Sequence, residues 1–155
     1  MDALAGIRQN AGPYPVDLLE GCETALLLFG AGFLGLNDGI HIADAGLDAF
    51  VIDIDREKLE HMVKLYPKTW TFCEADAWWF AENVNAQFDV VSVDNYTGDA
   101  EVPVLASLPL WCSLARKVVT VTKTRKNIQH SIPHGWEPSI VERSSRADWL
   151  VLERA

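Results

Sequence analysis

The stretch from residue 24 to residue 35, TALLLFGAGFLG, contains the pattern from which the fold of this chain is first predicted. An apolar run that ends at a glycine is typical of a β-strand buried on both faces. Gly30, Gly32 and Gly35 then follow the spacing G-x-G-x-x-G, in which glycine lets the backbone turn sharply and approach a ligand. The same spacing also serves tight packing between a strand and a helix. The glycines alone therefore predict a turn, and the rest of the chain must identify a ligand.

The chain has 155 residues, the size of one domain with a single buried core. It is 49% hydrophobic and 23% charged, which is typical of a globular protein. No apolar run approaches the roughly 20 residues of a membrane span. The first residues lack the charged-then-apolar layout of a secretory signal. Together with Cys22, Cys73 and Cys112, which form no C-x-x-C pair, these features favour a cytoplasmic protein without structural zinc.

Strand-like and helix-like segments alternate after an extended arm over residues 1–22. Buried strands are predicted at 24–30, 48–55, 69–77, 88–95 and 116–124, and helices near 36–46, 56–66, 78–84 and 102–115, the last broken at Pro109. Residues 137–145 and 147–155 read as an antiparallel β-hairpin. Because the connections between these strands and helices are short, the strands are expected to be parallel and joined by right-handed crossovers. We therefore expect one domain over 1–155, an α/β fold with a doubly wound, mostly parallel Rossmann-like sheet and a C-terminal antiparallel β-hairpin.

Ligands of such sheets bind at the carboxyl ends of the strands, so the residues just after each strand are the candidates. Asp53 lies 23 residues after Gly30, where an acidic side chain accepts hydrogen bonds from both hydroxyls of an adenosine ribose. Helix capping is the alternative role for Asp53, and Asp55 is its neighbour for that task. Up to this point, nicotinamide and adenosyl cofactors fit equally well.

The third strand separates the two cofactors. In "FCEADAWWF" it ends in Asp76 and Ala77, an acid and a small residue at the start of a short helix. This feature, "VIDIDREKLEHM" and the closing pair "WEPSIVERSSRADWLVLER" resemble the class I S-adenosylmethionine-dependent methyltransferases over residues 24–154. The resemblance implies S-adenosylmethionine as cofactor, with the adenine amino group on Asp76 and the ring against the amide of Ala77. The cofactor-binding residues it predicts are Phe29, Gly30, Ala31, Gly32, Asp53, Ile54, Asp76, Ala77 and Asp94.

Two features depart from that family. Many members carry an acid two positions before the first glycine, where it helps to position the methionine part, and this chain has Leu28 there. Either the amino-acid end of the cofactor is held by backbone and another polar group, or cofactor binding is weak. The family also usually has an N-terminal helical extension over the site. Only about twenty residues precede the first strand here, so Tyr14 and its neighbours would have to serve as the lid.

The fourth strand ends in "VDNYTGD". In the methyltransferase interpretation, Asp94 and Tyr96 are the catalytic candidates: Asp94 accepts a proton or orients a nucleophile, and Tyr96 shapes the methyl pocket. Asn95 is a candidate for substrate binding. The sequence departs at two positions from the D-P-P-Y type of the methylases that act on DNA amino groups. In the structural alternative, the next helix is capped by Asp94 and Asp99, and the side chain of Tyr96 packs against the protein. The segment also looks like the spermidine-synthase branch, in which an acid here activates an amine for aminopropyl transfer.

A basic loop follows the fifth strand of a chain whose formal net charge is −9. Lys123 and Arg125 are predicted to bind the substrate by holding an anionic group, and a solvated loop that balances nearby acids is the alternative. His130 and His134 do not form a convincing metal pair, because Pro133 breaks any helix and no third ligand is evident, so no metal is expected.

The sequence thus predicts an S-adenosylmethionine-dependent methyltransferase with a small-molecule acceptor. The overall acidity argues against nucleic acid as a partner, and no membrane partner is expected. A homo-oligomer could complete the uncovered site. The alternatives are an NAD(P)-dependent oxidoreductase that uses the G-x-G-x-x-G loop, an aminopropyltransferase, and a cofactor-binding module without catalysis.

Overall fold

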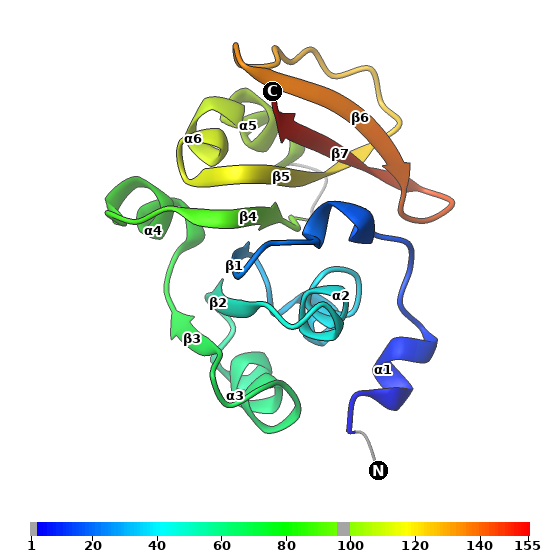
Figure 1. Ribbon diagram of the computed structural model, residues 1–155, viewed down its shortest axis with the longest axis vertical. Coiled ribbons are helices and arrows are strands. Elements are labelled where there is room, and N and C mark those ends of the chain that lie inside the picture. The colour runs from blue at the N-terminus through cyan, green and yellow to red at the C-terminus, as the bar shows by residue number, and fades with distance from the viewer. Residues whose placement is uncertain (1–2, 96–99) are drawn as a thin grey trace.

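A computed structural model describes residues 3–95 and 100–155 of the chain. Its centre is a seven-stranded sheet in the order β3-β2-β1-β4-β5-β7-β6 (Figure 1). The first five strands are parallel, and β7 runs antiparallel to both of its neighbours. The strands are β1 (Thr24–Leu28), β2 (Asp48–Asp53), β3 (Thr71–Glu74), β4 (Phe88–Val93), β5 (Ala115–Thr124), β6 (Trp136–Glu142) and β7 (Ala147–Arg154). The predicted doubly wound sheet and its C-terminal hairpin are confirmed.

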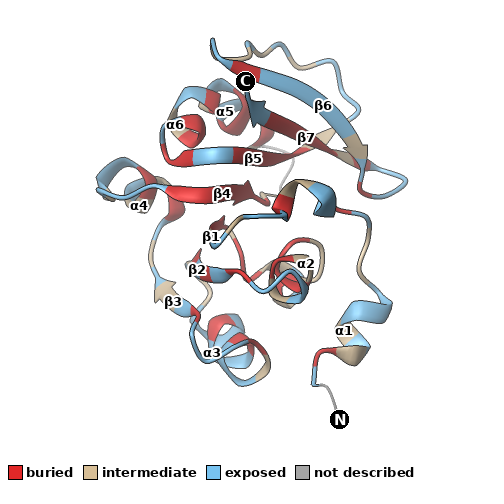
Figure 2. Cartoon of the chain, in the orientation of Figure 1, coloured by how far each residue is buried: buried red, intermediate tan, exposed pale blue. Residues whose placement is uncertain are grey.

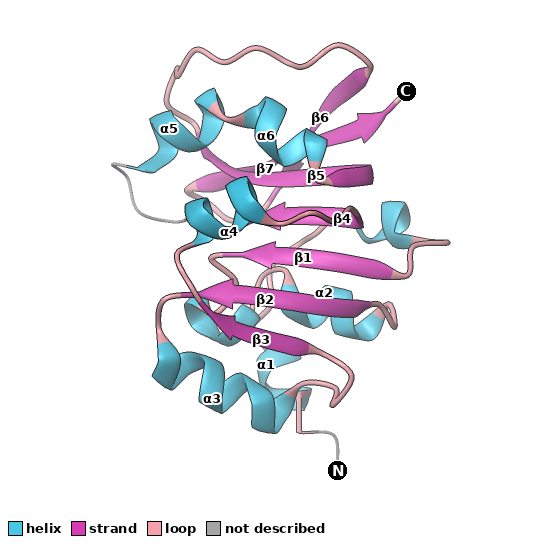
Figure 3. Cartoon of the chain, turned by 90° about the vertical axis from the view of Figure 1, so that its left-hand side faces the viewer, coloured by secondary structure: helices cyan, strands magenta, loops and turns pink. Residues whose placement is uncertain are grey.

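Helices cover both faces of this sheet. One face packs against α4 (Ala77–Asn83), α5 (Glu101–Ala106) and α6 (Leu108–Ser113). The other packs against α2 (Gly39–Asp44), α3 (Arg56–Leu65) and the N-terminal segment with α1 (Ala5–Gln9) and the 3-10 turn η1 (Val16–Leu19). A view turned by 90° shows the strands between these layers (Figure 3).

The two cores follow from alternation along the central strands. Leu26 and Leu28 of β1 belong to the core under α4, α5 and α6, whereas Leu27 belongs to the core under α2 and α3. All three are fully buried, and each such side chain contributes about 1.5–3 kcal/mol through loss of apolar contact with water. The strands β1 and β4 are buried almost throughout (Figure 2).

Three local features differ from the expected elements. The helix after the glycines does not begin near residue 36, because a 3-10 turn, η2 (Gly32–Gly35), comes first and α2 starts only at Gly39. The helical region over 102–115 is two helices that meet at Ser107, with Pro109 in the first turn of the second, where its missing N–H is tolerated. The N-terminal arm is not wholly extended, since it carries α1 and η1.

Candidate functional site

The carboxyl ends of the parallel strands form one edge of the sheet, and the loops that follow them make the candidate site (Figure 3). The strand order changes direction between β1 and β4, which are neighbours in the sheet but lie far apart in sequence. Such a switch point opens a crevice between loops that leave toward opposite faces. The glycine loop after β1 lies at this point.

The three glycines of this loop have different tasks. A Cβ on Gly30 would lie 2.8 Å from the carbonyl oxygen of Leu27 and 2.9 Å from Cγ1 of Val51, so Gly30 serves close packing. Gly35 has a φ of 71°, and a Cβ there would meet Cε of Met62 at 3.0 Å. A Cβ on Gly32 would meet nothing within 4 Å. The packing role proposed for the glycines therefore applies to Gly30 and Gly35, and Gly32 alone faces open space.

Three residues of the loop that are not glycine have left-handed backbone conformations. The φ angles are 58° at Phe29, 51° at Phe33 and 54° at Leu34. Each such residue costs on the order of 1 kcal/mol, so the surroundings must hold it in place. The hydroxyl of Tyr66 does so at one end by donating to the carbonyl oxygens of Leu34, at 2.8 Å, and Gly35, at 3.2 Å. Backbone strain held in this way concentrates at binding sites.

Asp53 fastens the other end of the glycine loop to the turn after β2. One of its carboxylate oxygens accepts from the amide of Ala31 at 3.0 Å, and the other accepts from the amide of Asp55 at 2.9 Å. The helix cap is Asp55, whose side chain accepts from the amide of Lys58 at 3.1 Å. The capping alternative for Asp53 is thus wrong. Asp53 is half-buried at the mouth of the loop.

The end of β3 presents Asp76 and Ala77 as the sequence indicated. Asp76 is exposed and caps α4 by accepting from the amide of Trp79 at 2.9 Å. Trp78 turns inward, with its ring 5.1 Å from that of Trp111 and 6.4 Å from that of Phe29. Trp79 remains 61% exposed.

Exposed apolar side chains gather along the same loops. Phe33 follows β1, Ile54 follows β2 and Trp79 follows β3, with exposures of 64%, 72% and 61%. The other tryptophans, Trp70, Trp111, Trp136 and Trp149, are buried, as expected for packing. Large apolar groups left in water beside half-buried acids are typical of a ligand-binding edge.

Asp94, after β4, lies in a different environment. Its carboxylate forms a short ion pair with Nη1 of Arg143, accepts from Nη2 at 3.2 Å, and accepts from the hydroxyl of Thr122 at 2.9 Å. Arg143 is 2% exposed, and its guanidinium lies 4.7 Å from the ring centre of Trp149. Asp94 is 8% exposed. These contacts favour a structural role for Asp94 over proton transfer, and its predicted catalytic role stays a prediction.

The basic loop after β5 is tied to the hairpin turn. Arg125 donates to the carbonyl oxygens of Ser144 and Ser145 and to the Asp148 carboxylate, the last at 3.1 Å. Lys123 donates to the carbonyl oxygen of Thr124 at 3.1 Å. The contact of Arg125 with Asp148 matches the alternative in which the charges of this loop balance nearby acids. The predicted substrate contacts of Lys123, Arg125 and Asn95 stay predictions, and Tyr96 and Asp99 lie outside the described residues.

A row of buried polar groups runs beneath the glycine loop on the α2 face, and the sequence analysis missed it. The hydroxyls of Tyr14 and Thr120 are 2.8 Å apart, Thr120 donates to Ser92 at 2.9 Å, and Ser92 donates to Asp38 at 3.0 Å. Burial and the neighbouring Asp94 raise the pKa of Asp38 to about 7. Alternate polar residues inside the valine-rich segments of β4 and β5 were the available signal.

Tyr14 is therefore not a lid. It is 5% exposed, its ring stacks on His41 at 5.7 Å, and it meets Trp149 edge-on at 5.1 Å. Burial raises its pKa above the ordinary value. Leu28 is fully buried in the opposite core, so the position of the family's usual acid is a packing position here.

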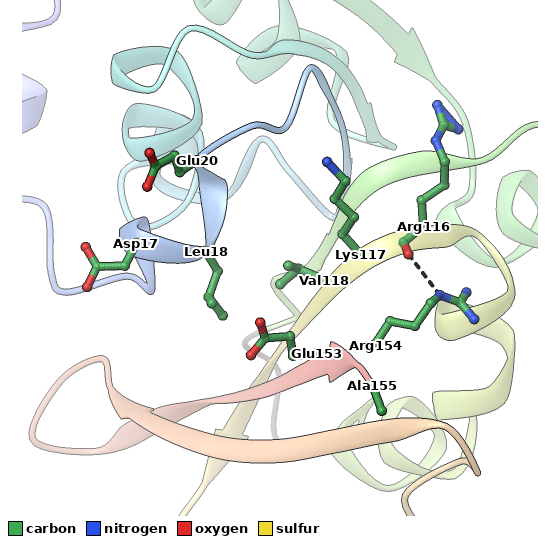
Figure 4. Close-up of a pocket in the computed structure, with 9 residues that line it drawn as sticks. All are labelled: Asp17, Leu18, Glu20, Arg116, Lys117, Val118, Glu153, Arg154 and Ala155. Carbon is green, nitrogen blue, oxygen red and sulfur yellow. Dashed lines mark hydrogen bonds between the residues drawn. The ribbon is translucent and has the colours of Figure 1, made fainter.

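A hollow of about 520 Å³ lies at the opposite edge of the sheet, between η1, the start of β5 and the end of β7 (Figure 4). Its cations are already engaged. Arg154 donates to the carbonyl oxygen of Arg116 at 2.8 Å, and Lys117 donates to that of Gly21 at 3.0 Å. This hollow is separate from the candidate site.

Residues 3–95 and 100–155 contain no group of three or more histidine, cysteine, aspartate or glutamate side chains that could hold a metal ion. Within the same ranges, no helix is long and apolar enough to cross a membrane.

The fold is that of the class I S-adenosylmethionine-dependent methyltransferases. Among the solved structures that match, yhhF of Escherichia coli, named as a proposed methyltransferase, has a TM-score of 0.72 at 14% identity, covering 97% of this chain and 86% of that one. Magnesium protoporphyrin IX methyltransferase (ChlM) from Synechocystis PCC 6803, solved with bound S-adenosylmethionine, has a TM-score of 0.61 at 18% identity, covering 99% and 82%.

A third similar structure is a protein from Clostridium thermocellum named as a proposed rRNA methylase, with a TM-score of 0.63 at 11% identity, covering 90% of this chain and 92% of that one. No family model and no curated protein matches the sequence. Two of these three names indicate an acceptor, magnesium protoporphyrin IX in one and rRNA in the other, so the likeness establishes the fold and leaves the acceptor open.

Proposed function

We propose that this chain is an S-adenosylmethionine-dependent methyltransferase that acts on a small-molecule acceptor. The observation that carries the proposal is the seat formed by Asp53, which joins the glycine loop at Ala31 to the turn at Asp55. Beside this seat, Gly32 leaves space that a side chain would fill. A rigid acid next to an open glycine suits the ribose end of an adenosyl ligand.

Asp53 has the capacity for this task although both of its oxygens already accept a hydrogen bond. A carboxylate has about four acceptor positions, so each oxygen keeps room for a ribose hydroxyl. Asp76 is exposed at the neighbouring strand end, where it would accept from the adenine amino group. The amide of Ala77, in the first turn of α4, would meet the ring, and the side chain of Ile54 would form its apolar wall.

The methionine end of the cofactor falls to the backbone of the glycine loop, from Phe29 to Gly32. Leu28 supplies no carboxylate there, because it is buried in the opposite core. Tyr66 and Asp53 hold the loop in place, which reduces the entropy lost on binding.

When bound, the cofactor supplies an electrophilic methyl group on a sulfonium. The task of the chain is to position the acceptor and to exclude water, with little proton or covalent chemistry of its own. In this proposal Asp94, paired with Arg143, fixes the end of β4. Asn95 and Tyr96, the latter outside the described residues, are the candidates for contact with the acceptor. Arg125 fixes the hairpin turn beside it, and Lys123 is the remaining cation for an anionic substrate.

The acceptor is proposed to be a small molecule because the formal net charge of −9 repels a phosphate backbone. We place the protein in the cytoplasm, where its free cysteines would stay reduced.

A dinucleotide suits this loop less well. The pyrophosphate of NAD needs the N-terminus of the helix that follows the glycines. Here η2 intervenes, and the first amide of α2, at Gly39, donates to Asp38 at 2.7 Å. A buried acid at that position opposes a second anion.

Differential scanning fluorimetry of the wild-type protein tests the proposal, with S-adenosylmethionine, S-adenosylhomocysteine, decarboxylated S-adenosylmethionine and NAD as ligands. We expect a higher melting temperature with the first two ligands and no change with NAD, because a ligand that binds only the folded state stabilises it. Stabilisation by NAD alone would reject the proposal in favour of an oxidoreductase. Stabilisation by the decarboxylated compound alone would favour aminopropyl transfer. Binding without labelled methyl transfer into host extract would favour a module without catalysis.

A further inference from the structure

Three successive helices begin with an aspartate, and one of these aspartates is unlike the others. Asp38, Asp55 and Asp76 cap α2, α3 and α4 through hydrogen bonds from backbone amides. The side chain of Asp55 is 42% exposed and Asp76 is exposed, whereas Asp38 is fully buried. Capping works at an exposed position, so it does not explain why a carboxylate is buried beside the glycine loop.

The hydrogen bonds of Asp38 suit a negative charge. One oxygen accepts from the amide of Gly39 and the other from the hydroxyl of Ser92. Ser92 in turn accepts from Thr120, whose hydroxyl lies 2.8 Å from that of Tyr14. When Tyr14 is the donor to Thr120, each of these three hydroxyl groups donates in the direction of Asp38. Each hydrogen bond in this row then strengthens the next.

Over residues 3–95 and 100–155, no cation forms a direct ion pair with Asp38. Asp94, just after β4, raises the pKa of Asp38, and Arg143, after β6, lowers it, but Arg143 donates to Asp94. Tyr14 from the N-terminal segment and Tyr66 from the end of α3 also face it, and the ionised form of each is disfavoured by Asp38.

His41 on α2 is the remaining titratable neighbour, stacked on Tyr14 and bonded to the carbonyl oxygen of Gly12 at 2.7 Å. The buried guanidinium of Arg143 thus pairs directly with Asp94 and acts on Asp38 through its charge.

This network adjoins the proposed cofactor seat. Asp38 lies three residues after Gly35, the last glycine of the loop. Strand β4, which carries its hydrogen-bond partner Ser92, continues the pairing with β1 through the amide of Asp94, which donates to the carbonyl oxygen of Leu28 at 3.2 Å. Water does not screen a fully buried charge as it screens a surface charge, so its field reaches the loop.

We propose that Asp38 determines the charge specificity of the site: its carboxylate makes the glycine loop prefer an adenosyl ligand with a positive sulfur over one with a neutral sulfur. The inference rests on the proposed function. Methyl transfer converts the positive sulfonium into a neutral thioether, so this preference favours binding of the methyl donor and release of the spent cofactor. Asp38 thereby supplies, from the α2 face, a negative charge that Leu28 cannot supply from its own position.

A dependence on pH follows, and its sign is fixed. The pKa of Asp38 is raised to about 7, first by burial and then by Asp94. A cationic ligand stabilises the ionised form and therefore lowers that pKa in the complex. Below about pH 7, binding must release a proton from Asp38, so affinity for the cation falls as the pH falls. A neutral thioether lacks this coupling.

Isothermal titration calorimetry of the full chain tests the inference, with S-adenosylmethionine and S-adenosylhomocysteine as probes at about pH 6 and about pH 8.5. For the wild type we expect the affinity ratio of the sulfonium over the thioether to rise about fivefold between these pH values. In Asp38→Asn, whose side chain can still accept from Gly39 and donate to Ser92, the ratio should stay constant. The α-amino groups of the ligands titrate near this range, but wild type and variant share that contribution.

A wild-type ratio that does not change with pH overturns the inference, and this comparison needs no variant. An equal change in Asp38→Asn also overturns it, because the charge effect would then come from elsewhere. Asp55→Asn is the matched control, since it changes an exposed cap of the same kind and should keep the wild-type dependence. If neither ligand binds at either pH, the proposed function itself fails, which is a different result from binding without discrimination.

Discussion

The two halves of the carboxyl edge use similar residues in opposite ways. In the half formed by β1, β2 and β3, Asp53 and Asp76 are half-buried or exposed and lie beside large apolar side chains in water. In the half formed by β4, β5 and β7, Asp94 is buried against Arg143, and Arg125 is bonded to the hairpin turn. The first half is open to a ligand, whereas the side chains of the second half satisfy one another.

This difference shows that a polar residue after a strand is not by itself a binding residue. Asp53 ends β2 and Asp94 follows β4 at the same sheet edge, with β1 between the two strands, but only Asp53 lies where a ligand can reach it. Mutations in each half can test this division between a ligand-binding half and a self-contained half.

The largest effect is expected at Arg143. Arg143→Met leaves the Asp94 carboxylate buried without its partner, which should lower the free energy of unfolding by about 3–5 kcal/mol. Urea denaturation followed by circular dichroism measures this. In the matched double variant Arg143→Met with Asp94→Leu, most of the loss should be recovered, because an apolar pair replaces the ion pair. A loss below about 1 kcal/mol in the single variant would show that the second half is not self-contained.

Asp53 should have the opposite signature. Asp53→Ala removes the proposed ribose acceptors and should weaken binding of S-adenosylmethionine by about 1.5–3 kcal/mol, the range for hydrogen bonds to a charged group. Calorimetric titration gives this value. Asp55→Ala is the control at the neighbouring position, where loss of the α3 cap should cost about 1 kcal/mol of stability and leave affinity unchanged. Equal affinities for wild type and Asp53→Ala would remove Asp53 from the site.

The glycine loop allows the same separation within one motif. Gly30→Ala places a methyl group 2.8 Å from a backbone oxygen and should destabilise the fold by about 1–3 kcal/mol. Gly32→Ala adds a methyl group to open space, so its melting temperature should stay near the wild-type value while its affinity for S-adenosylmethionine falls. If Gly32→Ala instead bound the ligand as the wild type does, the open space at Gly32 would not be part of the site.

The smallest effect concerns the other end of β4, where Asp89 accepts from the amides of Glu23, at 2.7 Å, and Thr24, at 3.3 Å. Burial alone would raise the pKa of Asp89, but these bonds and Arg116 lower it overall. A lowered pKa in the folded state means that its stabilisation is present above the unfolded value near 4 and is lost as the pH falls further. Asp89→Asn should lower the free energy of unfolding at neutral pH by about 1 kcal/mol. In acid, the difference in stability between wild type and variant should become smaller. The affinity for S-adenosylmethionine should not change. A change would show that Asp89, at the opposite edge of the sheet, affects the candidate site.

Much of the fold could be predicted from local signals. The buried run before Gly30 and the two apolar runs around residues 144–146 gave the parallel sheet and its hairpin, because period and turn residues act over short distances. The start of α2 was predicted too early, because the left-handed conformations of Phe33 and Leu34 depend on Tyr66, more than thirty residues away.

The candidate site divides along the same line. Asp53 ends a strand, and Asp76 and Gly32 come within four residues of a strand end, so their placement could be predicted from the sequence. The buried network could not, since Arg143 is 49 residues from Asp94 and Ser92 is 54 residues from Asp38. Tyr14 was predicted to cover the site, but it lies in the core. There its hydroxyl is hydrogen-bonded to that of Thr120 and its ring packs edge-on against Trp149.

Calorimetric titration of the wild-type chain and Asp53→Ala with S-adenosylmethionine and with NAD tests the central assignment of the open half most directly. The structure of the glycine loop leads us to expect saturable binding of S-adenosylmethionine to the wild type, at least tenfold weaker binding to Asp53→Ala, and no binding of NAD. Binding of NAD with no response to S-adenosylmethionine would contradict it.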